Sequence, residues 1–434
     1  MHLPHALTLG GHPPPEQNPQ RPSDGQLPLG LAPTGDLALV RERVRKDALD
    51  KWDALTPRDQ IRLHHGRVWF PEAAQSDFAA SLRPTPWATS QLCQRLGIPA
   101  AYFKRCPSQL QDLQFNHWIR QSDGHRDAEG DGYPPTPDRT DEEAPPETTG
   151  SEENCNETAC PDEPDAGSRP DAWLLRMKGD ALRGVLSSRY ARLDHDLLLD
   201  CLTPLIPQGF AVDWFSLNDG GLHLRLVDPR KPQSVLAGDD LLCGIHLANS
   251  EVGRRAVTVD ALVYRLVCQN GLIRLVKGKS LLYRRHVHFS APRFKEALED
   301  AVLVALTEAG RFLEQIRTAT RTPVPNVQAV LAQLGRQEAL SKSFLEAAER
   351  SLRSEPSGQQ ETVWGLANGL TQAGQALSAD DRYAVEALAG RLIEHGPPKV
   401  SVRSAEDNLV TVKECEKREQ ENGDHSARPV LVRA

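Results

Sequence analysis

Apolar residues change their spacing along the chain, and this change separates a strand-rich part from a helix-rich part. Between residues 172 and 290 short apolar runs alternate with polar positions, and the turn Asn218–Gly221 separates two such runs, as in a β-hairpin. After Ser290 apolar residues recur every third or fourth position, as in an amphipathic helix. Strands followed by helices predict an α+β fold, with an antiparallel sheet and a C-terminal set of helices.

Five apolar runs are expected to form the strands of this sheet. In the second run Leu222, Leu224 and Leu226 alternate with polar residues, which predicts a strand with one buried and one wet face. The stretch Val259–Val267 also fits a helix, so its assignment stays open. The expected strands are Ala211–Ser216, Leu222–Val227, Leu241–Leu247, Ala256–Cys268 and Leu272–Val276.

The helices expected after the sheet share the 3.6-residue period. The longest follows Ser290, and Ser378 with Asp381 resembles a capping box at the start of the last one, which Gly396 ends. The apolar face of the long helix consists of Phe294, Leu298, Val302, Ala305, Ala309, Phe312 and Ile316. Further helices are expected at Asn326–Leu352, Glu361–Leu377 and Asp380–His395.

The first folded block, residues 36–121, is predicted to be mainly helical. It opens with a charged helix candidate, Asp36–Leu55. Thr85 is expected to cap a short helix, which Pro99 separates from a second one at Ala100–Arg105. The pair resembles a helix-turn-helix, but the proline and the short second helix favour a packing corner over a recognition helix.

Two segments lack the apolar residues that a packed core needs. The first 35 residues include 13 Pro or Gly, and residues 122–171 contain no Leu, Ile, Val, Phe, Met or Trp. Both segments are therefore expected to be disordered, the second as an acidic insertion. The domain division predicted from these patterns is a tail 1–35, a mainly helical part 36–121, the insertion 122–171, a sheet-rich core 172–290, C-terminal helices 291–396 and a polar tail 397–434.

Charge is distributed unevenly between these segments. The insertion has 16 Asp and Glu against three Arg, a local net charge of −13; because the whole chain carries −8, the rest of the chain carries +5. The acidic total therefore does not exclude a nucleic-acid partner. No apolar run reaches the eighteen residues of a membrane span, and the N-terminus lacks a signal-peptide pattern, which predicts a cytoplasmic protein without membrane contact.

Motifs for cofactor or nucleotide chemistry are missing from the sequence. There is no phosphate-binding loop, dinucleotide fingerprint or nucleophile elbow, so an NTPase or a dehydrogenase is not expected. The eight cysteines are scattered without a Cys-x-x-Cys pair, which favours free thiols over a metal site. The sequence thus predicts neither a cofactor nor a catalytic site, and an enzyme is the less favoured interpretation.

The strongest chemical signal is a basic segment, Arg254–Lys295, with ten Lys and Arg against the single acid Asp260. Tyr264, Tyr283 and Phe289 are interleaved with these charges, a combination that binds single strands through phosphate attraction and base stacking. The alternative is a sheet face whose acidic partners come from elsewhere in the fold. The predicted nucleic-acid-binding residues are Arg254, Arg255, Arg265, Arg274, Lys277, Lys279, Arg284 and Arg285.

Other sites receive less support from the sequence. His286 and His288 lie two apart and could bind a metal with Asp194–Asp196, but no spaced carboxylate motif accompanies them. Cys268 has no base fixed near it. The loop Asn249–Gly253 is expected to be a structural turn. The acidic insertion is a possible internal competitor for the basic segment.

Five stretches of the chain, taken together, resemble the phage/plasmid-like family known as domain of unknown function 932. This resemblance implies a setting in mobile genetic elements and no particular activity. The matching stretches are Leu96–Ala100, Arg183–Tyr190, Asn249–Gly253, Tyr264–Gly271 and Thr362–Thr371. Together with the basic segment, they favour a mobile-element protein that binds nucleic acid, with single-stranded DNA as one candidate. The alternatives are a protein-interaction factor, including self-association, and a metal-dependent nuclease.

Overall fold

The computed structural model describes residues 35–74, 81–121, 172–276, 278–287 and 290–399. The acidic insertion and nearly all of the two predicted tails lie outside these residues. The chain divides into two compact units, and the boundary lies between Leu313 and Glu314, within one long helix.

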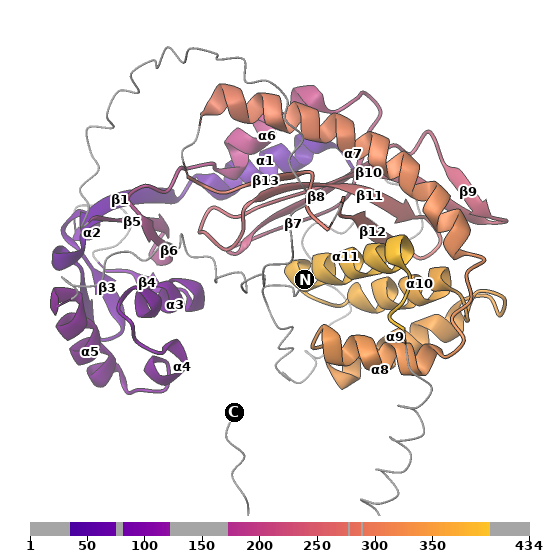
Figure 1. Ribbon diagram of the computed structural model, residues 1–434. Helices are drawn as coiled ribbons and strands as arrows, with labels where there is room; N and C mark the ends of the chain where they lie inside the picture. Colours follow the sequence, from indigo (N-terminus) through magenta and orange to yellow (C-terminus); the bar gives the residue numbers. More distant parts are fainter. Residues whose placement is uncertain (1–34, 75–80, 122–171, 277, 288–289, 400–434) are drawn as a thin grey trace, which may run out of the picture. The chain divides into compact units, whose positions relative to one another are not determined.

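A four-stranded sheet organises the first part of the N-terminal unit. Its strand order is β1-β5-β6-β4, antiparallel except for the β4–β6 pair (Figure 1). Because β1 pairs with β5, residues 36–121 and the sheet-rich region after residue 171 share one sheet and do not fold apart. The strands are β1 (Lys51–Pro57), β4 (Arg83–Pro84), β5 (Ala172–Lys178) and β6 (Ala181–Ser187).

Short helices and a hairpin complete the core beside this sheet. The core is apolar, and Phe70, Leu92, Phe115 and Leu175 are among its buried members. Phe103 of the second short helix belongs to it too, and that helix has only four residues, so the packing-corner interpretation fits and the recognition helix does not. The elements are η1 (Arg58–Gln60), β2 (Arg62–His64), β3 (Arg67–Trp69), α2 (Pro71–Ala74), α3 (Pro86–Arg95), α4 (Ala100–Phe103) and α5 (Ser108–Gln121).

The first predicted helix is wrong in its second half. Helix α1 (Leu37–Ala48) begins after the N-cap Asp36, whose carboxylate accepts the backbone N–H of Ala38 at 2.8 Å. It ends before Lys51, where the chain becomes β1. The seven register pairs between β1 and β5 override the helical pattern, which is a weak local preference.

The larger sheet has seven strands, all antiparallel. Its main order is β12-β11-β10-β8-β7; β13 also pairs with β11, and β9 with β10. The open assignment of Val259–Val267 is resolved as strand over most of its length. The strands are β7 (Ala211–Asn218), β8 (Gly221–Val227), β9 (Gln233–Leu236), β10 (Asp239–Asn249), β11 (Val257–Arg265), β12 (Asn270–Arg274) and β13 (Leu282–Arg284).

Both faces of strand β8 are buried, so the prediction of a wet face is wrong. His223 and Arg225 are 3% and 1% exposed, nearly as buried as the leucines that alternate with them. His223 Nδ1 lies 3.2 Å from Nε2 of His246, and the guanidinium of Arg225 lies 5.0 Å from the Trp214 ring centroid. A buried polar row therefore crosses the sheet, which sequence alternation alone cannot distinguish from a solvated face.

Helix α7 (Ala291–Ala319) confirms the long helix, and all seven residues of its predicted apolar face are buried. It runs along the large sheet in Figure 1, and Arg274 of β12 contacts both Glu308 and Phe312 on it. Two shorter elements, α6 (His195–Leu202) and η2 (Thr203–Leu205), connect the two sheets in sequence, and α6 packs against α1.

The C-terminal unit consists of helices, and one of them differs from the prediction. The expected helix Asn326–Leu352 is two helices, because Ala339 adopts a positive φ of 51° and Ser341 caps a new helix by accepting the N–H of Phe344. The predicted cap at Ser378 is confirmed by its bond from the N–H of Asp381. The helices are α8 (Val327–Gln337), α9 (Lys342–Ser354), α10 (Val363–Gly374) and α11 (Ala379–His395).

Helix α10 is buried on all sides between α9 and α11. A Cβ at Gly369 would lie 2.9 Å from the carbonyl oxygen of Ala348, so this glycine is what lets α9 approach so closely. The Trp364 side chain is 0% exposed and is the largest fully buried one among the described residues. This helix is therefore the centre of the C-terminal core.

We expect Trp364→Ala to lower the free energy of unfolding by about 3 to 5 kcal/mol, because truncation leaves a large cavity in a closed core. Urea denaturation followed by far-UV circular dichroism measures the change. Leu303→Ala is the control, since Leu303 is 59% exposed and its loss should change the free energy of unfolding by less than about 0.5 kcal/mol. Equal effects of the two substitutions would contradict this account of the core.

Candidate nucleic-acid interface

The loop between β10 and β11 is built around a buried carboxylate, that of Glu251, which is 2% exposed. Both terminal nitrogens of Arg183 donate to Oε2 at 3.1 Å, and Lys51 Nζ lies 2.9 Å from the same oxygen. The backbone N–H of His195, at the start of α6, donates to Oε1 at 3.1 Å. The carboxylate thus joins β1, β6 and α6 to the loop.

The Glu251 carboxyl group is ionised despite its burial. Burial by itself raises the pKa, but the cations of Lys51 and Arg183 outweigh it, so the pKa lies well below its usual value. A buried charge of this kind is stable only while its partners remain in place. The loop is therefore expected to have one conformation.

The backbone carbonyls of the same loop are held by side chains from the surrounding elements. Three consecutive residues, Ser250, Glu251 and Val252, each offer an oxygen to a neighbouring side chain. Ser250 also accepts the N–H of Arg254 on its Oγ, at 3.1 Å. The donors are Tyr190 Oη to Ser250 at 3.1 Å, Arg176 Nη1 to Glu251 at 2.9 Å, and Trp87 Nε1 and Gln91 Nε2 to Val252 at 2.8 and 3.0 Å.

This ordered loop positions the first residue of the basic segment at the surface. The guanidinium carbon of the exposed Arg254 lies 5.3 Å from the ring centroid of Trp87, in a cation–π arrangement. Gly220 makes room for it, because a Cβ at that position would lie 2.5 Å from Nη1 of Arg254. Trp87 is thus fixed by one bond to the loop and in turn supports the arginine that follows it.

Four of the eight predicted binding residues lie at one end of strand β11. Arg254 and Arg255 come just before this strand, and Val257 pairs with Arg284 of β13. Arg284 and Arg285 are exposed like Arg254, while Arg255 is half-buried. The structure therefore brings this set together, and we call it the basic cluster: Arg254, Arg255, Arg284 and Arg285.

Two other predicted residues pair with acidic groups inside the fold. Arg265 is 4% exposed and donates to both carboxylate oxygens of Asp239, at 2.7 and 2.8 Å. It lies at the opposite end of β11, about 26 Å along the strand from its first residue. Arg274 lies 2.9 Å from Glu308. These two arginines therefore fit the alternative interpretation of the basic segment, in which acidic partners from elsewhere in the fold neutralise its charge.

The last two predicted residues and the three interleaved aromatics do not share one environment. Lys279 is exposed in the turn between β12 and β13, and Lys277 lies outside the described residues. Of the three interleaved aromatics, Tyr264 is buried, Tyr283 is 58% exposed and Phe289 lies outside the described residues. The basic segment therefore does not form one exposed face.

Sequence reasoning missed two residues of this region, Trp87 and Arg189. Arg189 is exposed and precedes Tyr190, which pairs with Val287 in an isolated bridge beside the basic cluster. Arg189 could have been found from the sequence, because it belongs to Arg183–Tyr190, one of the stretches that resemble the family. Trp87 had no signal, because only the folded loop brings it under Arg254.

The described residues do not form the metal site that the sequence left as an alternative. His286 is buried, stacks on Tyr190 with a centroid distance of 4.9 Å, and lies with Nδ1 3.3 Å from the carbonyl oxygen of Ala191. Among the described residues no group of three or more His, Cys, Asp and Glu is arranged to hold a metal ion, and His288 lies outside them. Cys268, the other residue considered for chemistry, accepts a hydrogen bond on its Sγ from Nη1 of Arg265 at 3.4 Å.

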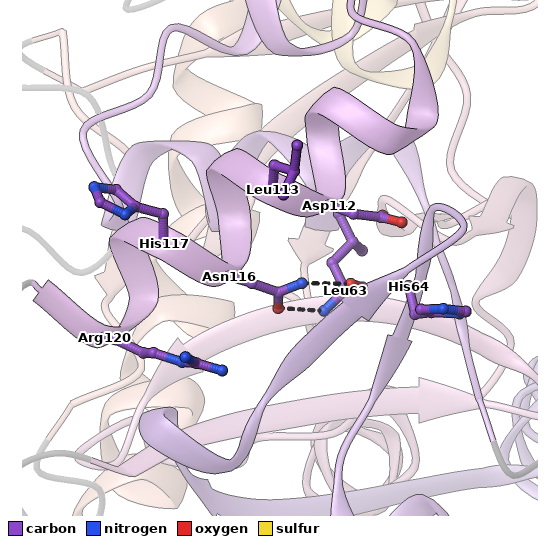
Figure 2. Close-up of a pocket in the computed structure, with 7 residues that line it drawn as sticks. All are labelled: Leu63, His64, Asp112, Leu113, Asn116, His117 and Arg120. Carbon is purple, nitrogen blue, oxygen red and sulfur yellow. Dashed lines mark hydrogen bonds between the residues drawn. The ribbon is translucent and has the colours of Figure 1, made fainter.

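A separate shallow hollow lies between α5 and the β2–β3 hairpin. Figure 2 shows that His64, His117 and Arg120 point in different directions along its rim. Its floor is structural, because the Asn116 amide donates to and accepts from the backbone of Leu63 at 2.7 and 3.0 Å. The two Asn116 bonds hold the hairpin on α5, and the charged side chains around the hollow do not point toward one common ligand position.

Comparison with known proteins supports one part of the resemblance. The family model described as Domain of unknown function (DUF932) matches residues 183–378. The chain is therefore similar to this family over a segment that includes four of the five resembling stretches, while Leu96–Ala100 lies before it. No curated protein and no solved structure matches the chain. Among the described residues, no helix is long and apolar enough to span a membrane.

Two buried histidines make the fold sensitive to acid. Burial lowers the pKa of His195 and of His286 to about 4 each, from an ordinary value of 6.5. The unfolded chain therefore takes up these protons first, and the stability that the neutral rings contribute above pH 6.5 is lost as the pH falls toward 4. Glu251 adds little to this loss down to pH 5, because its pKa is lowered in the folded protein and an ordinary Glu has a pKa of about 4.3.

We expect the free energy of unfolding to fall by about 2 kcal/mol per histidine between pH 7 and pH 5. Urea denaturation at the two pH values measures the loss. His286→Phe keeps a ring against Tyr190 but cannot take up a proton, so it should remove about half of the pH dependence. Equal stability of the unmodified protein at both pH values would contradict the burial of neutral histidines.

Proposed function

We propose that this protein binds nucleic acid through the basic cluster, as a cytoplasmic factor of mobile elements such as phages and plasmids. The observation that carries the proposal is the gathering of four arginines from two chain segments at one end of β11, three of them exposed. Guanidinium groups pair with phosphate oxygens in a bidentate manner, so such a cluster suits a polyphosphate backbone.

The order of the loop adds a second argument. Arg254 is held on Trp87, and the loop before it is fixed by buried hydrogen bonds, so little side-chain and loop entropy is lost when a ligand binds. A cluster that served only as a solvated surface has no need of such support. The competing function, a protein-interaction or self-association surface, uses the same exposed arginines but requires an acidic protein partner.

Phosphate binding predicts a defined salt dependence. If the four arginines each contact one phosphate of a single strand, the slope of log affinity against log salt should be about −2.8, from about 0.7 per contact. Arg284→Ala with Arg285→Ala should make the slope shallower by about 1.4 and weaken binding to all sequences alike. Fluorescence anisotropy with DNA and RNA oligonucleotides at several salt concentrations measures both effects.

The matched control removes the same charge from the C-terminal unit. Arg336 and Lys342 are exposed, and their replacement by Ala should leave both affinity and slope unchanged. Arg265→Ala is a second control, because it breaks a buried ion pair and should lower stability without a specific change of slope. If all three variants reduced binding equally, the cluster would not be the site, and no binding at low salt would favour the protein-interaction function.

The acidic insertion gives a prediction that rests on charge alone. Replacing residues 122–171 by a Gly/Ser segment of the same length changes the net charge of the chain from −8 to +5 and keeps the chain connected. We expect tighter binding at low salt, because the chain no longer repels a polyanion. The gain should vanish near about 1 M salt, where the Debye length is about 3 Å. Unchanged affinity at low salt would show that the insertion does not affect binding.

A further inference from the structure

The exposed ring of Tyr283 identifies which kind of nucleic acid fits the basic cluster. We propose that Tyr283 stacks on an unpaired base, so that the protein prefers single strands to duplexes. This inference rests on the proposed function, and it concerns the selectivity of the same site. It requires a flat ring at the surface, phosphate-binding groups beside it, and no competing use of the ring within the fold.

The position of Tyr283 meets the first two requirements. The side chain is 58% exposed on β13, a three-residue strand, and precedes Arg284 and Arg285 directly in sequence. Its strand neighbour Leu282 is 8% exposed, so β13 is held in the core while the tyrosine projects from it. Consecutive nucleotides of a single strand can therefore offer a base to the ring and phosphates to the two arginines.

Trp87 provides the contrast that singles out Tyr283. Its indole N–H is bound to the Val252 carbonyl and the Arg254 guanidinium lies over its ring, so Trp87 holds an arginine. It is a positioning residue. Tyr264, the other described aromatic of the basic segment, is only 4% exposed. Among the described aromatics of this segment, Tyr283 is therefore the one whose ring can meet a base from solution.

A duplex cannot make the same contact at low cost. Its bases are already stacked on each other, so a base must first be extracted before its face can meet the ring. In a single strand the faces are accessible, and stacking on an aromatic side chain is tolerant of sequence. The duplex would thus be bound by the arginines alone, and the single strand by the arginines and the ring.

The test compares Tyr283→Ala and Tyr283→Phe with the unmodified protein. The probes are labelled oligothymidylate, a strand of the same length with abasic sites in place of bases, and a duplex of that length, each titrated by fluorescence anisotropy. Tyr283→Ala should weaken oligothymidylate binding by about 5- to 150-fold, which corresponds to the stacking free energy of one base. Its salt slope should stay the same, because no phosphate contact is lost.

Several further outcomes support or overturn the inference. Tyr283→Phe should bind oligothymidylate as tightly as the unmodified protein does. The abasic strand should bind the unmodified protein and Tyr283→Ala with the same weak affinity. Tyr102→Ala is the matched control, since Tyr102 is 46% exposed on α4, outside the basic segment. Equal affinity of the unmodified protein for strand and duplex, with no effect of Tyr283→Ala, would overturn the stacking role and leave phosphate binding intact. Loss of all binding in the unmodified protein would instead overturn the proposed function itself.

Discussion

The burial of one charged carboxylate, that of Glu251, is the constraint on which the N-terminal unit depends. A carboxylate removed from water costs several kcal/mol unless cations and hydrogen-bond donors replace the lost solvation. The replacements here come from β1, β6 and α6, which are distant in sequence. The elements must therefore adopt their mutual arrangement together, because any one of them in a different place leaves a buried charge without compensation.

The same constraint determines what is presented at the surface. The loop that carries Glu251 ends at Arg254, and β11 begins three residues later, beside the strand that ends in Arg284. The ordered, buried part of the loop thus fixes the position of the two arginines that follow it. This is the usual division in functional sites, where a rigid buried scaffold supports exposed groups that would otherwise sample many conformations.

Patterns of short range could be predicted from the sequence, and pairings of long range could not. The 3.6-residue period gave helix α7 with its whole apolar face, and the capping residues at Thr85 and Ser378 act as expected. In contrast, the prediction of a helix that continues to Leu55 is wrong, because no local pattern indicates that β1 pairs with β5, more than a hundred residues later. The turn at Ala339 was missed because a non-glycine residue there has a positive φ.

The candidate site shows the same limit in electrostatic form. Counting charges along Arg254–Lys295 correctly finds an excess of cations. Such a count cannot show which carboxylates from other parts of the chain pack against this segment in the fold. Arg265 meets Asp239 across neighbouring strands, and Arg274 meets Glu308 on α7. Both pairs lie toward the interior, where desolvation favours neutralisation, whereas Arg284 and Arg285 lie at the exposed end of β13. Burial, which only the fold determines, therefore separates the arginines that hold the sheet together from those that can meet a phosphate.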